Sequence, residues 1–183
     1  MATTCLCGAG VTRGGVQAGI VETVSSALHI LVDADACPVK DEIYSVAFRH
    51  EIPITIVSNR YLRVPTHPLV RRTVVSDAFD AADDWIAGTA GPLTVVVTAD
   101  ILLADRCLKL GARVLSPTGQ PFTASSIGTA VAMRALLSDL RAGGDPMGGP
   151  SPFSKADRSR FRSRLDDILV SLRRSTSQDK RGQ

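Results

Sequence analysis

The feature that most constrains the fold is a series of short, uninterrupted aliphatic runs separated by segments with helical periodicity. The clearest runs are HILVD (29–33), ITIVSN (54–59) and LTVVVTAD (93–100). A short run of this kind is typical of a strand buried on both faces. Between the runs, apolar residues recur at helical spacing, as in 39–50 and 101–111. This alternation predicts an α/β fold with helices on both faces of a mostly parallel sheet.

The remaining segments fit the same alternation. We expect a short strand in TVVSD (73–77), a short helix in DAADDWIAGTA (80–90) and a last strand in ARVLSP (112–117). Two more helical patterns follow, at 125–144 and 154–174. The expected core is therefore a sheet flanked by helices, with additional helices at the C-terminus.

The length of 183 residues fits one domain with short appendages. Residues 1–27 are small and Gly-rich, which predicts a flexible extension; residues 28–174 hold the expected domain, and residues 175–183 form a disordered basic tail. No apolar run reaches the roughly 20 residues that span a bilayer, and the N-terminus lacks the apolar stretch of a secretory signal. We therefore expect a cytoplasmic protein whose four cysteines are free thiols.

Charge is unevenly distributed along the chain. Residues 155–183 carry nine lysines and arginines against four acidic residues, whereas the first 154 residues carry twelve against fourteen. A basic C-terminal segment beside an acidic body suits a polyanionic ligand held outside an acidic centre. A solvated helix laced with salt bridges gives the same composition, so the charge by itself does not select a function.

Two of the strongest predicted strands end in aspartate, at Asp33 and Asp100. The carboxyl ends of parallel strands meet at one edge of the sheet, where the functional crevice lies. Clustered carboxylates raise one another's pKa unless a cation lies between them, and Mg²⁺ or Mn²⁺ is the natural cation for such oxygen ligands. The metal-ligand candidates are Asp33, Asp35, Asp80, Asp83, Asp84, Asp100 and Asp105.

Several of these acids also have a structural explanation. Asp35 and Asp80 each precede a predicted helix and could cap it. Acidic residues in a first helical turn interact favourably with the helix dipole, which covers Asp83 and Asp84. Asp105 lies mid-helix, where a surface ion pair is common. Asp33 and Asp100 have less structural need to follow a buried strand, so they are our first choices as catalytic residues.

Basic and polar residues near the predicted strand ends are the candidate substrate contacts. The segment 60–72 is predicted as a loop or short helical turn and carries four arginines. Lys40 could bind a phosphate, although simple exposure is the favoured interpretation. Cys37 lies at a helix start, where a thiol pKa can fall, but a packed cysteine is favoured because no histidine follows at a suitable spacing. The candidate contacts are Lys40, Asn59, Arg60, Arg63, Arg71, Arg72 and Thr98.

With these residues assembled, the chain resembles the YaiI/YqxD family of small bacterial proteins. The resemblance covers about residues 29–172 and is carried, in order, by VDADACPVK, VVSDAFDAADDWI, VVTADILLADRCLKLGARVLSPTG, FTASSIG and GGPSPFSKADRSRF. That family is in turn similar to PIN-like and NYN-type nuclease domains. The similarity implies a three-layer sandwich with strand order 3-2-1-4-5 and a metal-dependent acidic site at the strand ends.

The resemblance also implies roles for individual residues. Asp33 matches the acid of the first strand, and Asp83 or Asp84 matches the acid of the central helix. Asp100 matches the acid after the fourth strand, with Thr98 ahead of it, and Asp105 is available for the last position of the set.

Three functions follow from these patterns. The first is a metal-dependent phosphodiesterase, an RNase-like nuclease that acts on RNA or another phosphate-containing ligand. The second is a nucleic-acid or protein-binding module with a degenerate PIN-like site. The third is a phosphatase in which Asp33 attacks phosphorus and Asp35 acts as the acid; the order of the later motifs disfavours it, because the acidic pair precedes the TAD strand.

Overall fold

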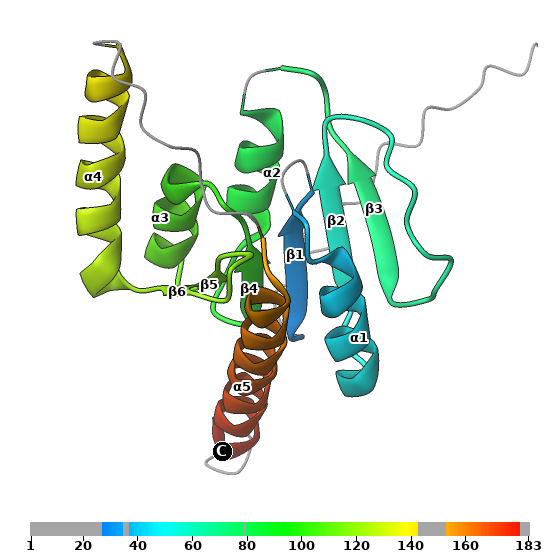
Figure 1. The fold of residues 1–183 in the computed structure, drawn as a ribbon. Coiled ribbons are helices and arrows are strands. Elements are labelled where there is room, and N and C mark those ends of the chain that lie inside the picture. The colour runs from blue at the N-terminus through cyan, green and yellow to red at the C-terminus, as the bar shows by residue number, and fades with distance from the viewer. Residues whose placement is uncertain (1–26, 35–36, 79, 143–152, 180–183) are drawn as a thin grey trace, which may run out of the picture.

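The computed structural model describes residues 27–34, 37–78, 80–142 and 153–179, with backbone alone at 135–142 and 178–179. Its centre is a six-stranded sheet in the order β3-β2-β1-β4-β5-β6, open at both edges (Figure 1). The strands are β1 (His29–Asp33), β2 (Ile54–Ser58), β3 (Val70–Val74), β4 (Thr94–Val97), β5 (Arg113–Leu115) and β6 (Pro121–Phe122). All neighbouring pairs are parallel except β5 with β6. The predicted α/β class and strand order are confirmed, with one antiparallel strand added.

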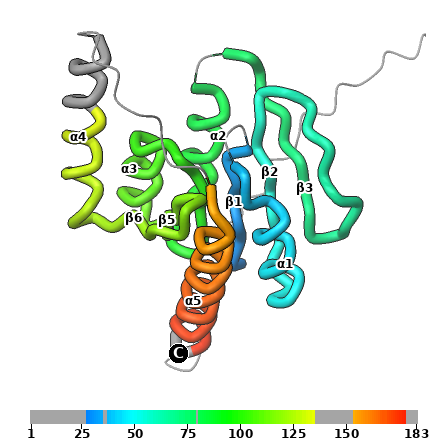
Figure 2. The backbone as a smooth tube through the Cα atoms, in the orientation of Figure 1, coloured from blue at the N-terminus to red at the C-terminus, as the bar shows by residue number. Residues whose placement is uncertain are grey.

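Helices cover both faces of the sheet, so that the fold has three layers (Figures 1 and 2). The helices are α1 (Lys40–His50), α2 (Ala81–Thr89), α3 (Ile101–Lys109), α4 (Ala124–Ala142) and α5 (Lys155–Asp179). The α1 and α5 helices pack together on one face, and α2 and α3 pack on the other. The α4 helix contacts α3 at the β6 end of the molecule (Figure 1).

The side chains of β1 show why its aliphatic run is unbroken. Ile30 and Val32 pack towards α1 and α5, while Leu31 packs towards α2 and α3, and all three are 0% exposed. Because successive residues of a strand point to opposite faces, a strand covered on both sides needs apolar residues at every position. The run ends at Asp33, which is half-buried at the carboxyl end of the strand.

The α5 helix closes its face of the sheet with one apolar stripe. Phe161, Leu165 and Leu169 follow the helical period and are 0% exposed within the α1 layer of the core. Gly119, in the turn after β5, has φ +80°, and a Cβ there would lie 2.8 Å from the backbone nitrogen of Phe161. The turn therefore touches the α5 backbone directly, and only glycine fits.

Some element boundaries differ from the sequence pattern. The predicted strand at 73–77 begins three residues earlier, as β3 (Val70–Val74), so Arg71 and Arg72 lie on an edge strand rather than in a loop. Most of β3 is partly or fully exposed, so it lacks the aliphatic run by which a buried strand is identified. The α5 helix continues to Asp179, within the segment that composition assigned to a disordered tail. The predicted extension 1–27 lies outside the described residues except for Ala27.

Candidate functional site

A hydrogen-bonded chain links the ends of the two central strands. Thr98, directly after β4, donates its hydroxyl to Asp33 Oδ2 at 2.8 Å, and the backbone N–H of Asp100 donates to Thr98 Oγ1 at 2.9 Å. Thr98 is 1% exposed, so its hydroxyl is fixed in place. Asp33 and Asp100 therefore meet at the carboxyl edge, and Thr98 orients the first of them.

Asp100 has a structural role that the strand pattern hides. Its side chain caps α3, where Oδ1 accepts hydrogen bonds from the N–H groups of Leu102 and Leu103. Arg134 of α4 binds the same oxygen at 2.8 Å. The expectation that Asp100 has little structural need to be there is wrong, although an aspartate directly before a helical pattern is the usual sequence sign of a cap. Arg134 had no such sign, because its contact is 34 residues away in the sequence.

Asp83, in the first turn of α2, shows that the acids converge electrostatically. The pKa of Asp83 is raised to about 6, first by burial and then by the charges of Asp33, Asp100 and Asp80, against the opposing charge of Arg106. A carboxylate feels several like charges in this way only when they lie nearby. Four of the predicted acids, from the end of β1, the start of α2 and the start of α3, thus share one electrostatic environment.

The other predicted acids have different surroundings. Asp84 binds Arg106 at 2.6 Å and Asp105 binds Lys109 at 2.7 Å, the surface ion pair expected for Asp105. Asp80 occupies the cap position of α2 with a left-handed backbone, φ 58°, but its side chain accepts no capping hydrogen bond. The alternative that Asp80 caps α2 through its side chain is therefore wrong. Asp35 lies outside the described residues.

Lys40 and Cys37 lie next to the turn after β1. Lys40 is half-buried and its ammonium donates to the carbonyl of Ala34 at 3.0 Å, so the expected simple exposure is wrong. Cys37 is 6% exposed, and burial raises the pKa of its thiol to about 11. The favoured interpretation of Cys37 as a packed residue rather than a nucleophile is supported by this shift.

The remaining substrate candidates follow β2 or lie on β3. Asn59 directly follows β2, and its buried Oδ1 has no hydrogen-bond partner among the described residues. Arg60 and Arg63 are exposed on the loop, and Arg71 and Arg72 are exposed on β3. Arg71 and Arg72 pair in register with Thr55 and Ile56, before the carboxyl end of β2. Burial and then the charge of Arg71 lower the pKa of His29 at the start of β1, so Arg71 lies toward the amino ends of the strands rather than beside the acids.

The donor set suits a hard divalent cation held partly by water. Within the described ranges, which omit Asp35, no three His, Cys, Asp or Glu side chains are close enough to hold one ion together. Mg²⁺ usually keeps several waters and binds one or two carboxylates plus substrate phosphate. Asp33 and Asp83 are oxygen donors of this kind, and the raised pKa of Asp83 is the electrostatic sign of a site that favours a cation.

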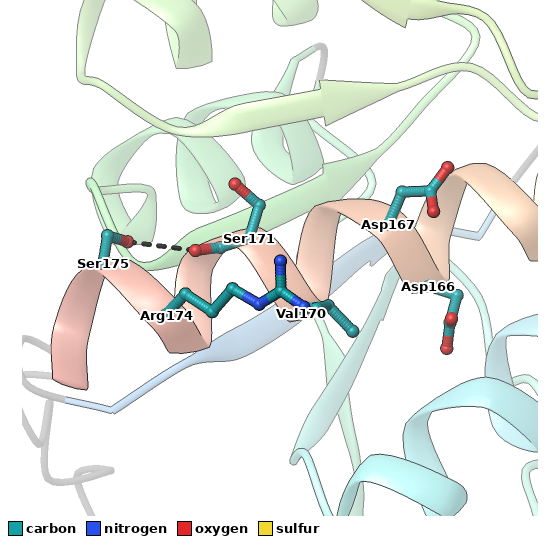
Figure 3. Close-up of a pocket in the computed structure, with 6 residues that line it drawn as sticks. All are labelled: Asp166, Asp167, Val170, Ser171, Arg174 and Ser175. Carbon is teal, nitrogen blue, oxygen red and sulfur yellow. Dashed lines mark hydrogen bonds between the residues drawn. The ribbon is translucent and has the colours of Figure 1, made fainter. Parts of the chain in front are cut away.

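An open hollow lies far from this chemistry, along α5 (Figure 3). Asp166, which lines it, is bound by Arg49 and His50 of α1. All lining residues come from one helix, so the hollow offers no convergence of groups from separate segments. They are Asp166, Asp167, Val170, Ser171, Arg174 and Ser175. We therefore place the candidate site at the acidic edge.

The fold and the site define an α/β protein with a parallel sheet and an acidic carboxyl edge. Among the described helices, none has the length and apolar character to cross a membrane. The family model described as "Uncharacterized BCR, YaiI/YqxD family" matches residues 31–171, and the chain belongs to this family.

Two similar bacterial proteins share the name "UPF0178 protein". A "UPF0178 protein" of Sphingopyxis alaskensis is 65% identical over 150 residues, which cover 81% of this chain and 97% of the relative. A "UPF0178 protein" of Nitrobacter winogradskyi is 53% identical over 150 residues, or 82% of this chain and 96% of the relative. No solved structure matches the chain.

Proposed function

We propose that the protein is a metal-dependent phosphodiesterase, an RNase-like nuclease that uses Mg²⁺ or Mn²⁺. The observation that carries the proposal is the meeting of Asp33 and Asp100 through Thr98 at the carboxyl ends of β1 and β4. Burial and the charges of Asp33 and Asp100 raise the pKa of the neighbouring Asp83 to about 6, in keeping with this convergence. Carboxylates that repel one another destabilise a folded protein, and a cation between them removes the repulsion. This arrangement is expected where a metal is held for chemistry.

Asp33 and Asp83 would hold the metal, with Asp100 beside them. Thr98 keeps the Asp33 carboxylate in one orientation, and Lys40 fixes the turn after β1 through the Ala34 carbonyl. A bound Mg²⁺ or Mn²⁺ supplies charge to a phosphodiester and lowers the pKa of a coordinated water. We keep Asp35 and Asp80 in the proposed ligand set and leave out Asp84 and Asp105, because each of those two binds a basic side chain.

The substrate proposed for this site is RNA or another phosphate-containing ligand in the cytoplasm. The guanidinium groups of the β2–β3 side would bind phosphates in a salt-dependent manner. Arg134, bound to Asp100, sets a further positive charge at the acidic edge. The basic residues proposed for phosphate contacts are Arg60, Arg63, Arg71, Arg72 and Arg134.

A binding module with a degenerate site is the second candidate. It is favoured by the engagement of Asp100 Oδ1 with both the α3 cap and Arg134, and by the absence of a three-ligand metal cluster within the described ranges. A phosphatase is the third candidate and depends on Asp35, which lies outside those ranges. Trapping a phospho-aspartate on Asp33 would favour it over the nuclease.

The test is cleavage of RNA and DNA oligonucleotides with Mn²⁺ or Mg²⁺ by the wild type, Asp33→Asn and Asp83→Asn. Asparagine keeps the size of each side chain and removes its charge. Asp105→Asn is the matched control, because Asp105 binds Lys109 on the helix surface. We expect cleavage by the wild type and the control, and a loss of at least about 100-fold in the other two. Equal turnover in all four proteins would contradict the proposal.

A further inference from the structure

Among the described residues, the most exposed large hydrophobic side chain is that of Tyr61, on the loop between β2 and β3. Tyr61 is 75% exposed, against about 50% for the next most exposed large hydrophobic residues. The guanidinium carbon of Arg72 lies 4.0 Å from the centre of its ring. At this exposure the opposite ring face is open to solvent. The pair therefore presents a flat aromatic surface that is supported from behind by a cation.

The loop that carries Tyr61 is held in place rather than loosely attached. From Tyr61 to Val64 the exposure alternates, with Tyr61 and Arg63 outward and Leu62 and Val64 packed against the core. Arg72 also donates a hydrogen bond to the carbonyl of Leu62 at 3.1 Å. The outward direction of Tyr61 therefore follows from its neighbours' burial, and its ring is partly ordered before any ligand binds.

The far end of the same loop is fixed as well. The ring of His67 stacks on Phe48 of α1 with centroids 4.0 Å apart, and His67 Nδ1 accepts a hydrogen bond from the backbone N–H of Leu69. Both ends of the exposed stretch are thus tied to the folded body. A ligand that binds Tyr61 meets a preformed surface.

The loop lies on the flank of the acidic edge. It leaves β2 one residue beyond Ser58, and β2 pairs directly with β1, which ends in Asp33. Neighbouring strands are about 4.8 Å apart, so β3 lies roughly 10 Å from β1. Tyr61 comes three residues after the carboxyl end of β2, the strand beside β1, so a chain bound at the acids would reach Tyr61 by passing over the end of β2.

We infer that Tyr61 stacks on an unpaired base of a single-stranded nucleic acid, with Arg72 behind the ring and Arg60 and Arg63 binding adjacent phosphates. Stacking on an aromatic ring tolerates any base and requires a base that is free of its duplex. Arg71 lies on the other face of β3, because successive residues of a strand alternate, and it is not part of this surface. The inference rests on the proposed function and narrows its substrate to single strands.

Binding of a fluorescein-labelled single-stranded RNA 12-mer, measured by anisotropy in EDTA, tests the inference. Tyr61→Ala is expected to weaken binding by about 5- to 100-fold, whereas Tyr61→Phe stays within about twofold of the wild type. Val74→Ala is the control, because Val74 is exposed on β3 but has no ring. An RNA duplex and a 12-mer of abasic residues are expected to bind without dependence on Tyr61.

Two results would overturn the inference: wild-type affinity in Tyr61→Ala, or no binding of the single strand by the wild type. Tyr61 is largely exposed, so its variants are expected to keep the wild-type melting temperature, which shows that they fold. Binding in EDTA does not depend on cleavage. Tyr61-dependent binding without cleavage in any metal would therefore keep this inference while removing the nuclease proposal.

Discussion

Carboxylates occur in two contrasting regions of this protein, the α1–α5 interface and the carboxyl edge of the sheet. At the interface, Asp166 is bound by Arg49 and His50, and the His50 hydrogen bond lowers the pKa of Asp166. At the edge, burial and like charges raise the pKa of Asp83 to about 6. An ionised aspartate thus stabilises the fold at the interface and destabilises it at the carboxyl edge. The difference separates acids that hold the fold together from acids retained at a stability cost, as functional sites often require.

A substitution that disturbs the packing of α5 against the turn after β5 should have the largest effect on stability. Gly119→Ala would force a Cβ to within 2.8 Å of the Phe161 backbone at φ +80°, which we expect to cost roughly 2–4 kcal/mol and lower the melting temperature by roughly 5–15 °C. Gly111→Ala is the control, since φ is +83° there but the nearest atom, on Pro92, lies 3.4 Å away. Its expected cost is about 1 kcal/mol. Equal losses in the two variants would show that backbone strain, rather than contact with α5, limits Gly119.

Removal of a basic partner at the interface should be the next largest effect. Arg158 binds Glu42 at 2.8 Å, and the Glu42 side chain is only 11% exposed. Arg158→Leu leaves a buried carboxylate without its partner and should cost about 1–3 kcal/mol by thermal or chemical unfolding. Arg160→Leu is the control because its partner Asp157 belongs to an exposed pair, where we expect less than about 0.5 kcal/mol. Equal losses in the two variants would show that the Arg158–Glu42 pair contributes no more to stability than an ordinary surface ion pair.

Neutralisation of an acid at the carboxyl edge should increase the free energy of unfolding, whereas the two changes above decrease it. Asp83→Asn is expected to stabilise the metal-free protein by about 1 kcal/mol at pH 7.5, or about 2–4 °C, after allowance for solvent screening. The folded pKa of about 6 lies above the unfolded value of 3.8, so the folded state binds more protons between these values. The contribution of Asp83 to stability therefore falls as pH rises from about 4 to 6, and the advantage of Asp83→Asn over the wild type should vanish near pH 4. A constant difference across that range would mean that the carboxylate charge is not its cause.

The sequence predicts those parts of the molecule that depend on local pattern. The buried strands β1, β2 and β4 carry aliphatic runs, and their alternation with helices predicts the parallel sheet and the position of Asp33 at the carboxyl end of β1. The strand order is implied by the resemblance to PIN-like domains rather than by local pattern. The sequence predicts β3 three residues too late, because an edge strand need not carry an aliphatic run. It does not predict β6, because two residues are too few to show a period. The contacts of Arg134 and Lys40 depend on tertiary approach to other segments. The α3 cap at Asp100 could have been read from the sequence, and its position after a strand concealed it.

Titration of Mn²⁺ into the metal-free protein shows whether the acidic edge binds a divalent cation. Isothermal calorimetry of the wild type and of Asp105→Asn should show binding, together with a rise in melting temperature as Mn²⁺ is added. Asp33→Asn and Asp83→Asn should lose both signals at the same metal concentrations. Absence of binding in the wild type, or equal binding in all four proteins, would contradict the account and favour a nucleic-acid or protein-binding module.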